Sequence, residues 1–273
     1  MARKDVEKTK NQWDFLSSNG VLFSRPYQEL TTEEASLCFP HLHFYGANLK
    51  DKNVLCLASG GGQQSIAFAL LGANVTVVDF SEEQLKKETT AAELHNVKLR
   101  LLNSDMRDLS ALQDDEFDIV FQSYSINYIP SIDELFEEVS RVIKKDGIYD
   151  LMFHNPFVHG SWKDGCFGNE WKKSELWKEK GYPIWQPYID GHPIKTDDPH
   201  WNFIDTEQRP IKIESPQEYK HTLSTIVNGL IKRNFNVLSI SEEVGQENNA
   251  QVGTWDHYVR VAPPWLYIVL KKV

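Results

Sequence analysis

Residues 53–80 form the segment that most constrains the fold of this chain. The apolar run VLCLA is followed by glycines at 60–62, helical periodicity from about Gln63 to Leu71, and a second apolar run, VTVVDF, whose strand ends at Asp79. Strands without polar alternation are typical of sheets covered on both faces, and two such strands joined by a helix form a parallel βαβ unit. The segment therefore predicts a parallel sheet with helices packed on it.

The alternation of strand and helix continues along the chain. It predicts helices over 82–94, over 132–144 and from Ser215-Pro216 to about Lys232, and strands near 97–103, at IVFQ, over 148–153, at NVLSIS and at WLYIVLKK. The two last strands follow the last helix, which favours antiparallel pairing at one edge of the sheet. We therefore expect an α/β fold with a Rossmann-like, doubly wound, mostly parallel seven-stranded sheet and an antiparallel terminal strand.

We predict one domain over residues 1–273 that divides into four parts. A polar helix over 5–19 and a capping box at Thr31–Glu34, which opens a second short helix, predict an N-terminal helical cap. The parts are this cap over 1–50, a cofactor-binding core over 51–154, a substrate lid or insertion over 155–215, and the last helix with the terminal strand pair over 216–273.

The insertion after the fifth strand is rich in aromatic residues and holds five of the eight tryptophans. Such rings can close over an apolar or cationic acceptor, form the core of a small subdomain, or make a dimer contact. We expect a subdomain core for most of them and substrate contacts for Trp185 and Tyr188.

The charge balance bears on the class of partner. Acidic residues outnumber basic ones by 39 to 29, giving a net charge of −10, whereas phosphate neutralisation needs clustered Lys and Arg. We therefore expect no nucleic-acid partner. Cys38, Cys56 and Cys166 lack the spacing of a zinc site or a disulfide framework, and the sequence shows no signal peptide and no membrane span. We expect a cytoplasmic monomer or homodimer without a metal.

The turn after the first strand has the composition of a cofactor loop. Its residues are Ala58-Ser59-Gly60-Gly61-Gly62, and the helix that follows presents free N–H donors at its start. Asp79 ends the next strand, where a carboxylate can accept hydrogen bonds from both ribose hydroxyls of an adenosine. A tight turn with a strand-end Asp in an unrelated α/β protein would look the same.

Two further features favour a cofactor loop over a tight turn in an unrelated α/β protein. Asp105-Met106 follows the third strand, and Phe121-Gln122-Ser123-Tyr124 ends the fourth. In this order the chain from Asn53 to about Phe153 resembles the class I S-adenosylmethionine-dependent methyltransferases. The resemblance implies S-adenosylmethionine as cofactor, with Asp105 and Met106 at its adenine. The implied cofactor-binding residues are Ala58, Ser59, Gly60, Gly62, Gln64, Asp79, Phe80, Asp105, Met106, Gln122 and Ser123.

The chain departs from this family at one point. In the family, an acidic residue stands two positions before the first glycine of the turn. In this chain Cys56 stands at the position of the acid and Ala58 at the position of that glycine. We expect Ala58 to have an ordinary negative φ. Backbone carbonyls of the loop or an N-terminal side chain remain as partners for the cofactor's amino group.

Two other functions remain open at this stage. An NAD(P)-dependent oxidoreductase needs G-x-G-x-x-G, but the third position here is Ser65. A noncatalytic small-molecule-binding relative would keep the fold and is not distinguished by sequence.

For the acceptor we expect an O or N atom of a small organic molecule. Methyl transfer depends mainly on alignment, and a nearby base can remove a proton from the acceptor. His154 is the first candidate base because an imidazole with an ordinary pKa near 6.5 is mostly neutral at pH 7. Tyr128 and His221 are the other catalytic candidates. The expected substrate contacts are Tyr27, Tyr124, Asn127, Trp185 and Tyr188. Packing is the alternative interpretation of the tyrosines and histidines among these.

Overall fold

The computed structural model describes residues 4–21, 24–46, 48–58, 60–160, 184, 186–194, 216–252 and 254–273. Its α-helices are α1 (Lys4–Ser18), α2 (Thr32–Leu37), α3 (Gln64–Leu70), α4 (Glu82–Leu94), α5 (Asp133–Val142), α7 (Leu223–Ile231) and α8 (Trp255–Val261). Short 3-10 helices are η2 (Leu42–Phe44) and η3 (Ser125–Tyr128). The strands are β1 (Asn53–Leu57), β2 (Asn74–Asp79), β3 (Leu99–Asn103), β4 (Phe117–Ser123), β5 (Ile143–His154), β6 (His192–Ile194), β7 (Glu218–Lys220), β8 (Phe235–Glu242) and β9 (Trp265–Lys272).

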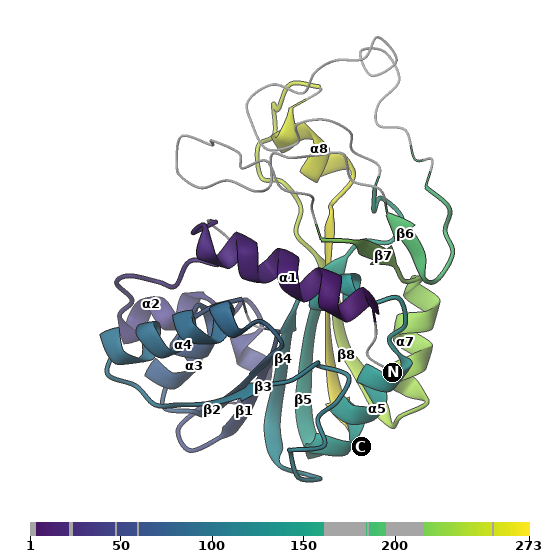
Figure 1. Cartoon of the computed structure of the whole chain (residues 1–273). Coiled ribbons are helices and arrows are strands. Elements are labelled where there is room, and N and C mark those ends of the chain that lie inside the picture. Colours follow the sequence, from purple (N-terminus) through teal and green to yellow (C-terminus); the bar gives the residue numbers. More distant parts are fainter. Residues whose placement is uncertain are drawn as a thin grey trace.

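The main sheet confirms the predicted fold. Seven strands lie in the order β3-β2-β1-β4-β5-β9-β8 (Figure 1). The pairs among the first five strands are parallel, and β9 is antiparallel to both β5 and β8. The strand order reverses between β1 and β4, which is where doubly wound sheets bind ligands at their carboxyl ends.

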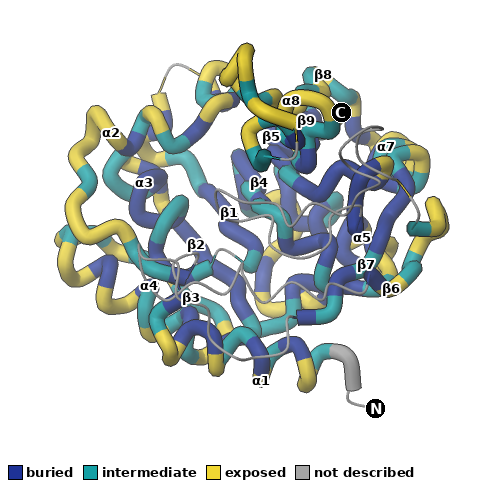
Figure 2. Tube along the Cα trace, turned by 90° about the horizontal axis from the view of Figure 1, so that it is seen from above, coloured by how far each residue is buried: buried dark blue, intermediate teal, exposed yellow. Residues whose placement is uncertain are grey.

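Side chains of β1 alternate between two apolar cores. Leu55 and Leu57 face a core shared with α5 and α7, while Val54 and Cys56 face a core shared with α2 and α3. Both faces of β1 are covered, which explains its uninterrupted apolar sequence. Figure 2 shows these buried central strands surrounded by helices whose outer faces are exposed.

The helix starts follow local hydrogen bonds. The predicted capping box is present: the Thr31 side chain accepts from the Glu34 amide, and Glu34 accepts from the Thr31 amide. α4 begins after Ser81, which accepts from the Gln84 amide.

The predicted start of the last helix at Ser215-Pro216 is wrong. Residues 218–220 form β7, which pairs antiparallel with β6 in a separate two-stranded sheet. α7 begins only at Leu223, because Thr222 caps it and the Asp190 carboxylate accepts from the Thr222 amide at 2.6 Å. In addition, α8 lies between the two last strands, where the sequence analysis predicted no helix.

Two helices lie across the carboxyl ends of the strands. Figure 1 shows α1 across this end of the sheet, with α8 farther out from it. Asp14 of α1 accepts from the Ser81 hydroxyl at 2.6 Å, which fixes α1 to the start of α4. Within the described segments, no helix combines the length and apolar character needed to cross a membrane.

Candidate active site

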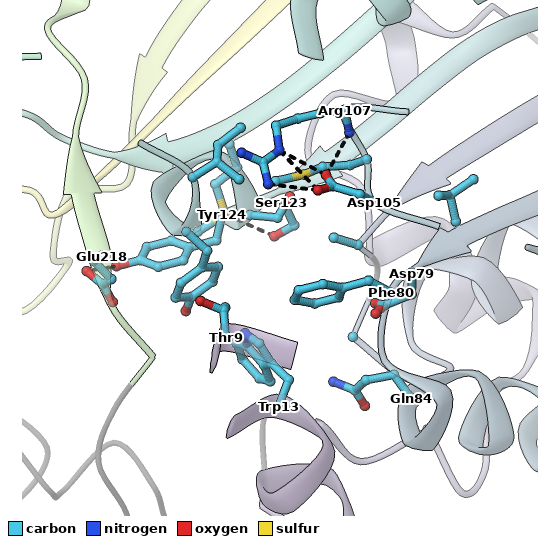
Figure 3. Close-up of a pocket in the computed structure, with 18 of the residues that line it drawn as sticks. Thr9, Trp13, Asp79, Phe80, Gln84, Asp105, Arg107, Ser123, Tyr124 and Glu218 are labelled. Atoms are coloured by element: carbon cyan, nitrogen blue, oxygen red, sulfur yellow. Dashed lines mark hydrogen bonds and ion pairs between the residues drawn. The ribbon is translucent and has the colours of Figure 1, made fainter. Parts of the chain in front are cut away.

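A cavity of about 350 Å³ lies at the carboxyl ends of β1, β2 and β4. This volume falls within the range of about 300–1,000 Å³ that is common for small-molecule sites. In Figure 3, Asp79 and Phe80 lie at one end, Glu218 lies at the opposite end, and Ser123 and Tyr124 lie between them. The predicted residues that line the cavity are Ala58, Gly60, Gln64, Asp79, Phe80, Asp105, Met106, Ser123, Tyr124, Tyr128 and His154.

The glycine-rich turn begins with a residue whose backbone the sequence did not predict. Ala58 has φ +47°, so the expectation of a negative φ is wrong. Its amide stays in the sheet by donating to the Val78 carbonyl at 2.8 Å, while the chain turns sharply toward Gly60. A left-handed conformation costs a non-glycine residue roughly 1–2 kcal/mol. Tyr124, which follows the neighbouring strand β4, also has a positive φ, +62°. Such strain commonly marks functional sites.

Packing against α4 also requires glycine in this turn. A Cβ on Gly62, where φ is +92°, would lie 2.7 Å from the Ala91 Cβ, and one on Gly61 would lie 2.7 Å from Gln84 Oε1. Gly62 does not line the cavity. Its role in the structure is close packing rather than ligand contact.

A buried carboxylate beneath the turn holds it in place. Glu88 of α4 accepts from the Gly62 amide at 2.7 Å and from the Ser65 hydroxyl at 2.5 Å. Cys56, at the position where the family has an acid, is fully buried, and burial raises the pKa of its thiol well above its usual value. Glu88 therefore places a carboxylate on the α4 side of the loop, but this carboxylate does not line the cavity.

Asp79 is the buried acid at the end of the cavity formed by β2. Its side chain accepts from the Ser81 amide at 2.8 Å, and the residue is 5% exposed. Burial raises the pKa of this carboxyl to about 7, and the nearby charges of Glu88 and Asp14 act in the same direction. The amides of Ser81 and Gly60 partly offset that increase by stabilising the carboxylate.

Asp105 forms a bidentate pair with a residue that the sequence analysis did not consider. Arg107 donates through Nη2 to Asp105 Oδ2 at 2.7 Å and through Nε to Oδ1 at 3.0 Å. Met106 lies beside this pair, and the buried Gln122 donates to its sulfur at 3.2 Å. Gln122 thus supports the wall from behind and does not line the cavity.

Aromatic rings and one carboxylate form the other end of the cavity. Tyr124 donates its hydroxyl hydrogen to Glu218 Oε2 at 3.3 Å and lies 5.8 Å from the Tyr128 ring. Trp13 of α1 meets Tyr128 edge-on at 5.4 Å. Glu218 is almost completely buried, and burial raises the pKa of its carboxyl to about 7.

His154 lines the cavity, but its expected ordinary pKa is wrong. Its ring stacks on His159 at 4.2 Å with an interplanar angle of 11°. Burial, followed by the charge of His159, lowers the pKa of His154 well below 6.5. His154 is therefore neutral at pH 7, as assumed, but a weaker base than an exposed imidazole.

Several predicted residues do not line the cavity. His221 donates through Nε2 to the Ile126 and Ile129 carbonyls, and Asn127 uses its Oδ1 to accept from the His154 amide. Tyr27 lies at the surface near Cys38, and the Tyr188 hydroxyl accepts from the Leu223 amide at the start of α7. Ser59 and Trp185 lie outside the described residues, as do the other tryptophans of the insertion.

The sequence analysis missed several lining residues besides Arg107. These are Val6, Thr9, Trp13, Gln63, Val78, Gln84, Ser104, Ser125, Ile129, Met152, Glu218, Trp255 and Trp265. Trp13 had a usable signal, since it is a large aromatic residue in the polar helix predicted over 5–19. Glu218 had none, because a three-residue strand shows no periodicity.

Comparison with known proteins decides between the possible functions. A family model described as a methyltransferase domain matches residues 55–150. The Bacillus subtilis protein named uncharacterized methyltransferase YbaJ is 31% identical over 197 residues, which cover 72% of this chain and 71% of that protein. The chain belongs to the class I S-adenosylmethionine-dependent methyltransferases. Its cofactor is S-adenosylmethionine, and the oxidoreductase alternative is not favoured.

Two further similarities concern a curated relative and a solved structure. A Pseudomonas syringae ubiquinone biosynthesis O-methyltransferase is 32% identical over 118 residues, which cover 40% of this chain and 48% of that protein. The crystal structure of an S-adenosylmethionine-dependent methyltransferase from Mesorhizobium loti has a TM-score of 0.62 at 16% identity, covering 90% of this chain and 100% of that chain. The similarity to the Mesorhizobium loti structure shows that the two proteins share a fold.

The described residues of this methyltransferase fit its cofactor. The buried Asp79 carboxylate lies at the cavity wall as an acceptor for hydroxyl groups, and Gly60 leaves space at the turn, with φ +81°. When bound, the cofactor supplies the electrophilic methyl group on its sulfonium.

Proposed function

We propose that this methyltransferase transfers the methyl group to an O or N atom of a small organic molecule bound beside Tyr124 and Glu218. The observation that carries the proposal is one continuous cavity with an adenosine-type carboxylate, Asp79, at one end and a second buried carboxylate, Glu218, at the other. In this proposal the Asp79 end of the cavity binds the cofactor. The Glu218 end offers a carboxylate to the methyl acceptor.

In this proposal the cofactor residues have distinct roles. Asp79 accepts hydrogen bonds from the ribose hydroxyls, and Asp105 and Met106 contact the adenine. Ser123 and Tyr124 lie along the path from this end toward Glu218 (Figure 3). Tyr124 helps to align the acceptor with the methyl group, which is the main requirement of an in-line displacement.

The character of the cavity favours a small acceptor over nucleic acid. Among the described residues that line it, Arg107 is the one Lys or Arg, and it is paired with Asp105. Phosphate contacts require several cations, and the chain carries a net charge of −10. The largely apolar walls, which include several aromatic rings, are typical of small-molecule sites.

A labelling experiment tests the proposal. The protein is incubated with S-adenosylmethionine carrying a labelled methyl group and with the low-molecular-weight fraction of a bacterial extract. We expect label to enter a small molecule, heavier by one methylene, with the parent protein and much less with Asp79→Ala. Label found only in nucleic acid or protein in a whole extract would contradict the proposed acceptor class.

A further inference from the structure

We propose that the methyl acceptor is a protonated amine, and that Glu218 both binds its ammonium group and removes the proton that blocks attack. This inference rests on the proposed function and names its substrate class. Glu218 is a residue that the sequence analysis did not single out.

Within the described part of the chain, the buried Glu218 carboxylate has no Lys or Arg partner. His159 Nε2 lies 2.7 Å from Oε2, and the Tyr124 hydroxyl donates to the same oxygen at 3.3 Å. Among the described residues, no hydrogen bond falls on Oε1, and no Lys or Arg forms an ion pair with Glu218. Oε1 is therefore the oxygen left for a ligand at this end of the cavity.

The histidines near Glu218 do not supply the missing positive charge. Burial lowers the pKa of both His159 and His154 well below 6.5, so both rings are neutral at pH 7. Neutral His159 can still donate its Nε2 hydrogen to the carboxylate. Lys220, two residues along β7, directs its Nζ to the Gln186 carbonyl at 3.4 Å. A buried carboxylate without a countercharge is costly, and an ammonium ligand would provide one.

The aromatic rings that line the cavity also favour a positively charged ligand. Trp13, Tyr128, Trp255 and Trp265 line the cavity, and the two C-terminal tryptophans meet edge-to-face at 5.8 Å. The faces of such rings attract a cation, with Trp the strongest. An alcohol or phenol could donate a hydrogen bond to Glu218, but it would bring no positive charge to the carboxylate or to the ring faces. The combination therefore favours a nitrogen acceptor over an oxygen acceptor.

Methyl transfer to the amine requires only the ammonium group, Glu218 and the methyl sulfonium of the cofactor. The ammonium proton passes to Glu218, which leaves a lone pair on nitrogen. That lone pair forms the new N–C bond while the S–C bond breaks, and sulfur keeps the bonding pair as a neutral thioether. The product is an N-methylammonium ion, and Glu218 then releases its proton to solvent. A carboxyl whose pKa lies near 7 is suited to this exchange at neutral pH.

The test measures recognition of charge in the protein with S-adenosylhomocysteine bound. The probes are benzyltrimethylammonium and neopentylbenzene, which have the same shape and differ by the positive charge. Calorimetry should show the ammonium probe binding at least about tenfold more tightly. Glu218→Gln should weaken the ammonium probe by about tenfold to a hundredfold and leave neopentylbenzene unchanged.

Two controls make the outcome specific. Glu242→Gln changes an exposed carboxyl on β8 and should leave both probes unchanged. Glu218→Gln should bind S-adenosylhomocysteine as the parent does, which shows that it is folded. Equal binding of the two probes, or no effect of Glu218→Gln on the charged one, would overturn the inference while the proposed function stands. Failure of the parent to bind S-adenosylhomocysteine would instead overturn the cofactor site and both proposals.

Discussion

Replacing Asp79 by Asn should stabilise the fold at neutral pH while weakening cofactor binding. The reason is that the folded protein holds this carboxyl in a buried site, where burial raises its pKa from 3.8 to about 7. Asn has nearly the same shape and never ionises. It also keeps one oxygen to accept from the Ser81 amide.

The pH dependence of the effect follows from the direction of the shift. Below about pH 4, Asp79 is protonated in both the folded and the unfolded chain, so the variant and the parent should be equally stable. Between about pH 4 and about pH 7 the unfolded chain releases the proton and the folded chain retains it. Asp79 therefore lowers the free energy of unfolding progressively over this window, and the full loss is reached above it.

The size of the effect follows from the same shift. About three pKa units at 1.36 kcal/mol per unit give a ceiling of about 4 kcal/mol. We expect a gain of about 1–3 kcal/mol at about pH 8, because Asn gives up part of the hydrogen bonding that the carboxylate makes to the Ser81 and Gly60 amides. Affinity for S-adenosylhomocysteine should fall by about 1.5–3 kcal/mol, since bonds from the ribose to a charged group are lost.

Urea unfolding of parent and variant at about pH 5 and about pH 8 measures the first effect, and calorimetry measures the second. The stability difference should be larger at the higher pH. A difference that does not change with pH, or a variant less stable than the parent at about pH 8, would refute the reasoning about this buried carboxyl.

Three other predictions concern single features of the molecule. His154→Gln should leave kcat within about tenfold of the parent, because the buried His154 imidazole is a weakened base. A loss above about a hundredfold would show that His154 is the base. Glu88→Gln should lower the free energy of unfolding by about 1–3 kcal/mol, because the Gly62 and Ser65 hydrogen bonds lose a charged acceptor; an unchanged urea midpoint would show that Glu88 does not hold the loop. The protein should not shift DNA or RNA in a gel at about 0.15 M salt, and a salt-sensitive shift at submicromolar protein would contradict the assigned acceptor class.

The residues at the Asp79 end of the cavity were predictable as a cluster because each lies in a local sequence pattern. The glycine turn, Asp79 and Asp105-Met106 each follow a strand with a clear apolar signal, and parallel strands bring their carboxyl ends to one edge. The sequence could not show that Ala58 is left-handed, because a small residue reveals its conformation only through the packing around it. The same holds for Gly62, which contacts Ala91 rather than the cavity.

The opposite end of the cavity was predicted poorly because its lining residues come from distant segments. Glu218 is placed by β7, whose partner β6 is too short for periodicity to reveal, and Trp255 belongs to a helix inside what reads as a polar loop. Asp190 holds the Thr222 cap and so delays the last helix, which leaves His221 outside the cavity. The pKa of His154 depends on its stacking with His159, a contact that residue types alone do not reveal.

A crystal structure of the complex with S-adenosylhomocysteine would show directly whether the cavity holds the cofactor as proposed. We predict ribose hydroxyls on the Asp79 carboxylate, adenine beside Asp105 and Met106, and the thioether sulfur facing the end of the cavity that Tyr124 and Glu218 form. A ligand bound elsewhere, or one whose sulfur points away from Glu218, would contradict the proposal.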